Sequence, residues 1–277
     1  MGFAASYAVL VLVQAVLVLV PGRARRLGSS RALGLAVPAF ALVLGVAIVR
    51  AHGGAAFLTA LAAVATPVLA AGAGWARGWR LPWLPAVVVS PLYALAWLRP
   101  GTLPADAAGV ALIAGACLAA TGIVAALAPQ GWLRAGLVLL VALDVALVWG
   151  SRQVAPTMQA LSAATPPTLG HVGHPMPSLQ QVDFGSATMG WLDLAAPALL
   201  GLLVARRRRA AAATGLAAGA WGLLLFATSP IAATPPVLAG LVAGRRPRPG
   251  LSGRLASTMN AASGRFGWSG RSRPFVR

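Results

Sequence analysis

The chain has 277 residues, of which 58% are hydrophobic and only 9% are charged. A soluble domain is excluded, because the apolar residues form runs that can cross about 30 Å of hydrocarbon as helices. All 22 basic residues are arginine, which we attribute to the codon bias of a GC-rich genome, so the net charge of +18 does not indicate nucleic-acid binding. With Cys117 as the single cysteine, disulfides and cysteine-based metal sites within one chain are excluded as well.

Nine apolar segments predict an all-α, polytopic membrane protein with nine transmembrane helices. They cover approximately residues 4–21, 33–49, 55–74, 82–98, 105–127, 132–150, 187–205, 210–228 and 230–244. The first segment comes before its nearest arginines, which is typical of a retained anchor and not of a cleaved signal peptide.

The arginines predict how these helices are oriented. When successive loops are assigned to alternate sides, 19 arginines, including Arg77 and Arg134, fall on one side, and Arg50, Arg99 and Arg152 fall on the other. The positive-inside rule places the 19 in the cytoplasm, so we expect the N-terminus outside and the C-terminus inside a bacterial-type cytoplasmic membrane. We expect anionic lipid headgroups to contact a run of four consecutive arginines on the inner side, Arg206, Arg207, Arg208 and Arg209.

Two of the four acidic residues, Asp144 and Asp193, lie within predicted helices. An ionisable group at bilayer depth costs roughly 2.5–3.5 kcal/mol even on insertion scales, so such a residue needs a functional reason. The sixth helix is predicted to end near Gly150, and the seventh to begin near Ala187 after an N-cap at Ser186. Both aspartates are then six residues inside the outer end, at a depth of about 9 Å.

The ninth predicted helix adds a third feature at this level. If it begins at Ser229 and Pro230, in the favoured order of a cap followed by proline, then Pro236 is also six residues inside the outer end. The two carboxylates and this proline are therefore expected to lie at one depth.

Three short motifs occur at that depth. They are Leu143-Asp144 in the sixth predicted helix, Gly190-Trp191-Leu192-Asp193 in the seventh and Pro236-Val237-Leu238 in the ninth. Together they resemble the YD, GxGD and PAL motifs of the presenilin and signal peptide peptidase family of intramembrane aspartyl proteases, which have nine transmembrane helices. Pro197, four residues after Asp193, also matches the family, whereas Leu143 and Leu192 replace its tyrosine and glycine. Because glycine there would let a substrate backbone approach closely, Leu192 either narrows specificity or marks an inactive relative.

The resemblance implies a role for each motif. Asp144 and Asp193 would be the catalytic residues, and the substrate would be a transmembrane segment of type II orientation or a remnant signal peptide. The substrate must be unwound locally, and residues 178–184 and the proline motif would hold it extended, because unpaired backbone groups are costly in hydrocarbon. The residues implied in substrate binding are Gly190, Leu192, Pro236, Val237 and Leu238.

Two carboxylates close together in a medium of low dielectric cannot both be ionised, so the pair is expected to share one proton. The ionised member would take a proton from the attacking water, and the protonated member would donate a hydrogen bond to the scissile carbonyl. This chemistry needs neither a metal nor a cofactor.

This interpretation divides the chain by role. Residues 1–131 would be a scaffold of five helices, residues 132–244 would carry the catalytic helices and an outer loop over 151–186, and residues 245–277, rich in Arg, Gly and Ser, would be a disordered cytoplasmic tail. His171 and His174 in the outer loop could pair on zinc, but they have no third ligand nearby, so we favour an ordinary solvated loop.

Three other functions compete with the protease. In a proton- or ion-coupled transporter the two aspartates would line a pathway, although no inverted repeat is apparent. A type IV prepilin peptidase also uses membrane aspartates, but nine helices and the proline motif fit it poorly. A catalytically inactive family member would act as a membrane scaffold.

Overall fold

A computed structural model describes residues 2–22, 28, 30–51, 53–150, 152, 154–164, 176–223 and 234–245. The chain divides into a compact unit, Met1–Gly244, and a second unit, Arg245–Arg277. Of the predicted cytoplasmic tail only Arg245 is among the described residues. The predicted division at residues 131 and 132 separates a scaffold from the catalytic helices by function, and it stays a prediction.

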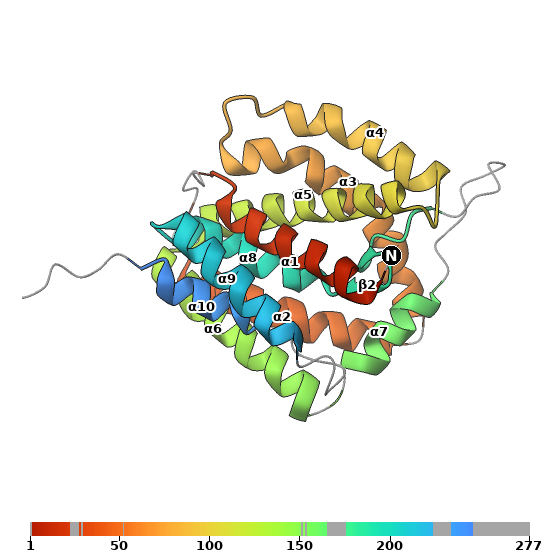
Figure 1. Cartoon of the computed structure of the whole chain (residues 1–277). Coiled ribbons are helices and arrows are strands. Elements are labelled where there is room, and N and C mark those ends of the chain that lie inside the picture. The colour runs from red at the N-terminus through yellow and green to blue at the C-terminus, as the bar shows by residue number, and fades with distance from the viewer. Residues whose placement is uncertain are drawn as a thin grey trace, which may run out of the picture. The chain divides into compact units, whose positions relative to one another are not determined.

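The described residues of the compact unit are mostly helical, as predicted, and they include a short β-hairpin (Figure 1). Its elements are α1 (Phe3–Leu19), α2 (Arg31–Arg50), α3 (Gly54–Arg77), α4 (Leu84–Leu98), α5 (Leu103–Leu127), α6 (Gln130–Val145), the π-helical turn η1 (Ala146–Gly150), α7 (Val154–Ala163), β1 (Val182–Phe184), β2 (Ala187–Met189), α8 (Trp191–Leu203), α9 (Arg207–Gly222) and α10 (Pro236–Ala243). The sequence did not predict α7, which lies in the proposed outer loop.

Three helices are long and apolar enough to cross a membrane: α3, α5, and α6 together with η1. The apolar helices α1, α4 and α8 are shorter, within the part of the chain that the structure describes. Each of the nine predicted segments contains one helix, but nine crossings and their orientation stay predictions.

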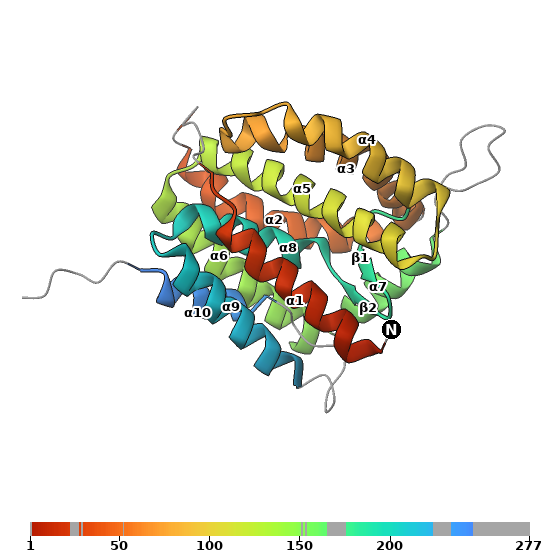
Figure 2. The ribbon, with the colours of Figure 1, turned by 45° about the horizontal axis from the view of Figure 1, so that its top comes forward.

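Helix α5 is central to the packing, because α3, α4 and α8 all contact it. Gly115 and Gly122 let α3 approach α5 closely: a Cβ atom at Gly115 would lie 3.0 Å from the Cβ of Ala70, and one at Gly122 would lie 2.7 Å from the carbonyl oxygen of Ala76. Figure 2 shows α1 crossing α8, with the hairpin near the N-terminal end of α1. Small residues at such contacts are typical of helix packing in lipid.

Arg77 corrects one part of the sequence analysis. It was assigned to a cytoplasmic loop, but it is the last residue of α3 and its side chain is 0% exposed. Helix α3 continues past its predicted end until Gly78 terminates it with a φ of 62°. The Arg77 guanidinium donates to the carbonyls of Leu118 on α5 and Ala198 on α8, each at 2.9 Å.

The C-terminal end of α8 binds two more arginines. Arg134 of α6 donates to the carbonyl of Leu203, and Arg207 of α9 donates to that of Gly201, both at 2.9 Å. The last carbonyls of a helix have no partner within the helix and carry its negative dipole end, so guanidinium groups stabilise them. These contacts hold one end of α8, and Asp193 lies near the other.

Candidate functional site

Asp144 is the penultimate residue of α6, and its side chain is 8% exposed. Thr234 donates twice to the same carboxylate oxygen, Oδ2 of Asp144: its Oγ1 lies at 2.6 Å and its backbone nitrogen at 3.3 Å. Thr234 is 1% exposed. A buried carboxylate is therefore held by a residue that lies 90 positions later in the chain.

Thr234 lies two residues before α10, and the position of this helix differs from the prediction. Helix α10 begins at Pro236, so this proline is in the first turn and not six residues inside; residues 229 and 230 lie outside the described residues. Pro236 takes the first helical position, which proline favours, and Thr234 stays outside the helix because a residue before proline, here Pro235, disfavours helical geometry. The non-helical Thr234 is thus free to turn both of its donors toward Asp144.

Asp193 lies in the first turn of α8, because this helix too begins later than predicted. The helix begins at Trp191 with Gly190 as its N-cap, whereas Ala187–Met189, expected to be helical, forms strand β2. The backbone N–H of Gly190 donates to Oδ2 of Asp193 at 2.8 Å. A carboxylate in a first helical turn satisfies a free N–H group and lies at the positive end of the dipole.

The hairpin explains why the helix starts late. Strands β1 and β2 are antiparallel, with Val182 opposite Met189 and Phe184 opposite Ala187. Gly185 makes the turn with a φ of 58°, which favours glycine, and the predicted N-cap Ser186 is the other turn residue. Residues 178–184 were expected to help hold the substrate extended, and of these, residues 182–184 form strand β1.

Gln14, a buried polar residue of α1, fixes the backbone at Asp193. Its Nε2 donates to the Asp193 main-chain carbonyl at 3.1 Å, and its side chain is 2% exposed. In a regular helix that carbonyl would bind the N–H of residue 197, but Pro197 has none. Gln14 therefore supplies the donor that the proline removes.

Asp144 and Asp193 lie on neighbouring helices. Helices α6 and α8 are in contact, and the Asp144 and Asp193 carboxylates are close enough to interact electrostatically. Asp193 is also within electrostatic range of Tyr7 on α1 and of Cys117 on α5. The Cys117 thiol is fully buried, and its Sγ donates to the carbonyl of Trp191 at 3.5 Å.

The residues predicted to bind substrate lie around this pair. Gly190 donates its backbone N–H to the Asp193 carboxylate. Leu192 is partly buried against the apolar cluster that contains Leu137, Leu200 and Val237. Val237 is 1% exposed, so its side chain packs within the protein, whereas Leu238 is partly exposed and Pro236 is buried. Contacts of Val237 with a substrate would therefore have to come from its backbone.

A metal site is not indicated. Residues 2–22, 28, 30–51, 53–150, 152, 154–164, 176–223 and 234–245 contain no group of three or more His, Cys, Asp or Glu side chains that could hold an ion. His171 and His174 lie outside these residues.

Two functional candidates, Gln14 and Thr234, were missed in the sequence. Gln14 is the only amide side chain in the first apolar segment, and Thr234 stands next to two prolines. The proline four residues after Asp193 did signal a missing helical donor, but nothing in the sequence identified Gln14 as its replacement.

Comparisons of the chain with protein-family models, curated proteins and solved structures gave no match. A functional proposal therefore depends on the motifs and on the geometry around Asp144 and Asp193.

Proposed function

We propose that the protein is an intramembrane aspartyl protease of the presenilin and signal peptide peptidase type. The observation that carries the proposal is the meeting of three separate segments. Asp144 on α6 is within electrostatic range of Asp193 on α8, and Thr234, two residues before α10, donates hydrogen bonds to Asp144. The Asp144 carboxylate is buried and the Asp193 carboxylate is half-buried, and they come from helices that contact each other; such a pair suits acid and base catalysis on a peptide bond.

In the proposed reaction, one carboxylate is ionised and the other protonated. The ionised one removes a proton from water as the water oxygen attacks the scissile carbonyl carbon. The protonated one donates a hydrogen bond to the carbonyl oxygen and then its proton to the leaving nitrogen. The C–N bond breaks, which yields one new carboxyl group and one new amine. Thr234 and Gly190 position the two acids, each through an Oδ2 atom.

The hairpin supports the substrate class. A transmembrane helix exposes its carbonyls only when unwound, and unwound backbone needs hydrogen-bond partners in lipid. Among the described residues, strands β1 and β2 pair only with each other, so each has an edge without a strand neighbour. Strand β2 ends at Met189, four residues before Asp193. An extended substrate would bind by strand addition beside the aspartates.

The proposal includes nine crossings, with the N-terminus outside and the C-terminus inside a bacterial-type cytoplasmic membrane. The hairpin and the start of α8 would face the outer side, and the exposed side chains of Arg206, Arg208 and Arg209 would meet anionic headgroups on the inner side. A type II transmembrane segment or a remnant signal peptide is the proposed substrate.

The test is incubation of the purified protein with a model type II transmembrane peptide, followed by mass spectrometry of the products. The protease predicts two fragments whose masses add to that of the peptide plus one water. In parallel, the protein in liposomes is assayed for proton flux. Flux without peptide products would support a proton-coupled transporter, and neither flux nor products across a panel of peptides would support an inactive scaffold.

A further inference from the structure

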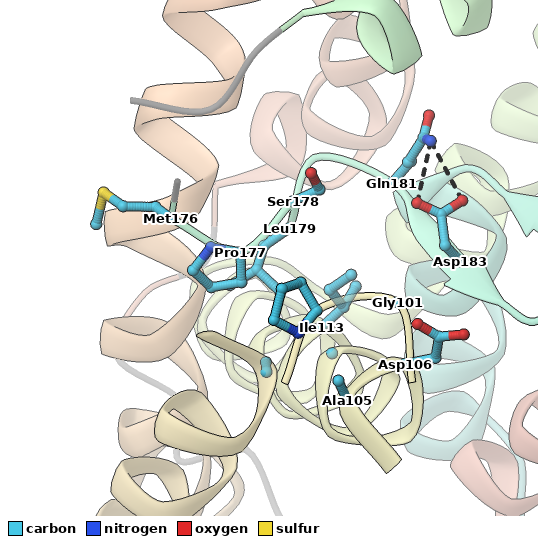
Figure 3. A pocket seen from close by; sticks show the side chains of 13 residues that line it. Gly101, Ala105, Asp106, Ile113, Met176, Pro177, Ser178, Leu179, Gln181 and Asp183 are labelled. Carbon is cyan, nitrogen blue, oxygen red and sulfur yellow. Dashed lines mark hydrogen bonds between the residues drawn. The ribbon is translucent and has the colours of Figure 1, made fainter. Parts of the chain in front are cut away.

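A cavity of about 220 Å³ lies beside the hairpin, and neither Asp144 nor Asp193 lines it. Its walls come from the link between α4 and α5, from the first turns of α5 and from the segment that leads into β1. Figure 3 shows Asp106 and Asp183 on one side of the cavity and Met176 and Pro177 on the other. A cavity of roughly 150 Å³ holds a benzene molecule, so this one has room for a small organic group.

Half of the acidic residues of the chain line this cavity. Only four residues are acidic, against 22 arginines, and two of the four line this cavity. Asp106 Oδ2 accepts from the Gly185 N–H at 3.0 Å, and Asp183 accepts from Gln181 at 3.0 and 3.2 Å and from Thr188 at 2.7 Å. All of these donors are neutral, and within the described residues no arginine pairs with either carboxylate.

The rest of the cavity wall is apolar, and it leaves open space beside Gly109. Ile113, Leu179 and Met176 line it, together with Gly109 on α5. A Cβ atom added at Gly109 would meet only the Cδ2 atom of Leu179, at an ordinary 3.8 Å. The site thus combines two negative groups at one side with an apolar space for a stem.

We propose that this cavity binds an organic cation, an ammonium or guanidinium group on an apolar stem of a few carbons. Asp106 and Asp183 would form charge-assisted hydrogen bonds with the cationic head, and the stem would lie along Ile113 and Leu179. The ligand is either a free amine or a basic side chain in the outer flank of a transmembrane substrate. The second source depends on the proposed protease function.

An occupied cavity would be coupled to the hairpin. Asp183 is the middle residue of β1, and Asp106 holds the turn through Gly185. Both carboxylates that would bind the cation therefore also contact the hairpin that precedes Asp193, so the ligand would order the same strands that are proposed to receive the substrate.

The first experiment measures binding directly, without cleavage. Purified full-length protein is titrated with pentylammonium and with pentanol as the neutral control, by calorimetry or saturation-transfer NMR. We expect saturable binding of pentylammonium only. Asp106→Asn with Asp183→Asn, which removes both negative charges and keeps one acceptor oxygen at each position, should weaken it roughly tenfold or more. Gly109→Leu, which fills the cavity and leaves the carboxylates in place, should do the same.

Absence of saturable binding, or binding unchanged in Gly109→Leu, would overturn the proposal. The two variants alter the cavity in different ways. If the double aspartate variant misfolds, the binding of pentylammonium to Gly109→Leu still tests the proposal.

The second experiment tests whether the bound cation is a free amine or a basic side chain of the substrate. Model peptides with lysine or norleucine in the outer flank are compared for cleavage, and a lower KM for lysine that disappears in Gly109→Leu indicates the substrate side chain. Equal KM values together with pentylammonium binding indicate a free amine. Pentylammonium binding in a protein that cleaves no peptide would support the cation site and contradict the protease.

Discussion

The side-chain amide of Gln14 on α1 donates to the main-chain carbonyl of Asp193 on α8 at 3.1 Å, where Pro197 leaves this carbonyl without a helical partner. A single polar residue of the first helix thus completes the backbone around a proposed catalytic aspartate. Loss of this donor would leave a buried acceptor unpaired, which costs about 1–3 kcal/mol.

We therefore expect Gln14→Leu to lower the free energy of unfolding by about 1–3 kcal/mol and to reduce the cleavage rate. Pro197→Ala restores an N–H four residues after Asp193, so it should rescue Gln14→Leu in part. Unfolding and cleavage of both single variants and the double variant form a double-mutant cycle. If the effects of the two substitutions simply add, the proposed relationship between Gln14 and Pro197 is wrong.

Thr234 is expected to position Asp144 through its hydroxyl. Thr234→Val keeps the shape but removes the donor of the 2.6 Å hydrogen bond, and Thr234→Ser keeps the donor. A hydrogen bond to a charged group is worth about 1.5–3 kcal/mol, which corresponds to roughly 10- to 150-fold in rate. We expect such a loss of kcat for the valine variant and near-normal kcat for the serine variant; equal kcat values for both would contradict a positioning role.

Substitution by alanine in the hairpin turn should impair substrate binding at Gly185 but not at Ser186. Gly185 has a φ of 58°, and a Cβ atom there would lie 2.5 Å from the Oγ of Ser6, so Gly185→Ala is both strained and crowded. The side chain of Ser186 is exposed, which makes Ser186→Ala the matched control. We expect a higher KM for the model peptide in Gly185→Ala alone. An unchanged KM would argue against substrate binding at the hairpin.

The orientation can be tested with single cysteines, because Cys117 is fully buried and should not react with a maleimide. In intact cells, an impermeant maleimide should label Ser178→Cys, whose side chain is exposed on the proposed outer side. Arg245→Cys should react only after the membrane is permeabilised. The opposite pattern would reverse the orientation and remove the argument for type II substrates.

The sequence predicted the helical architecture well, because apolar segments of sufficient length have few alternatives in lipid. It placed Asp144 correctly near the end of the sixth segment, since Gly150 marks that end. The sequence assigned residues 178–184 to holding an extended substrate; residues 182–184 form strand β1, and the substrate role stays a prediction.

Contacts between distant residues could not be predicted in this way. Residues 187–189 are apolar enough for a helix, and only their pairing with residues 182–184 makes them a strand. Arg77 resembled a loop arginine because charge suggests exposure, but its guanidinium binds carbonyls on α5 and α8. Gln14 and Thr234 became visible as partners of the aspartates only when α1 and α10 were placed beside them.

The most direct test of the account is the cleavage rate of purified Asp144→Asn, Asp193→Asn and double variants, measured beside the wild-type protein on one transmembrane peptide. Because a catalytic pair acts as a unit, each single variant should lose cleavage as completely as the double variant, while all three remain folded. A folded single variant that cleaves at a rate near that of the wild type would contradict the assignment of Asp144 and Asp193 as a catalytic pair.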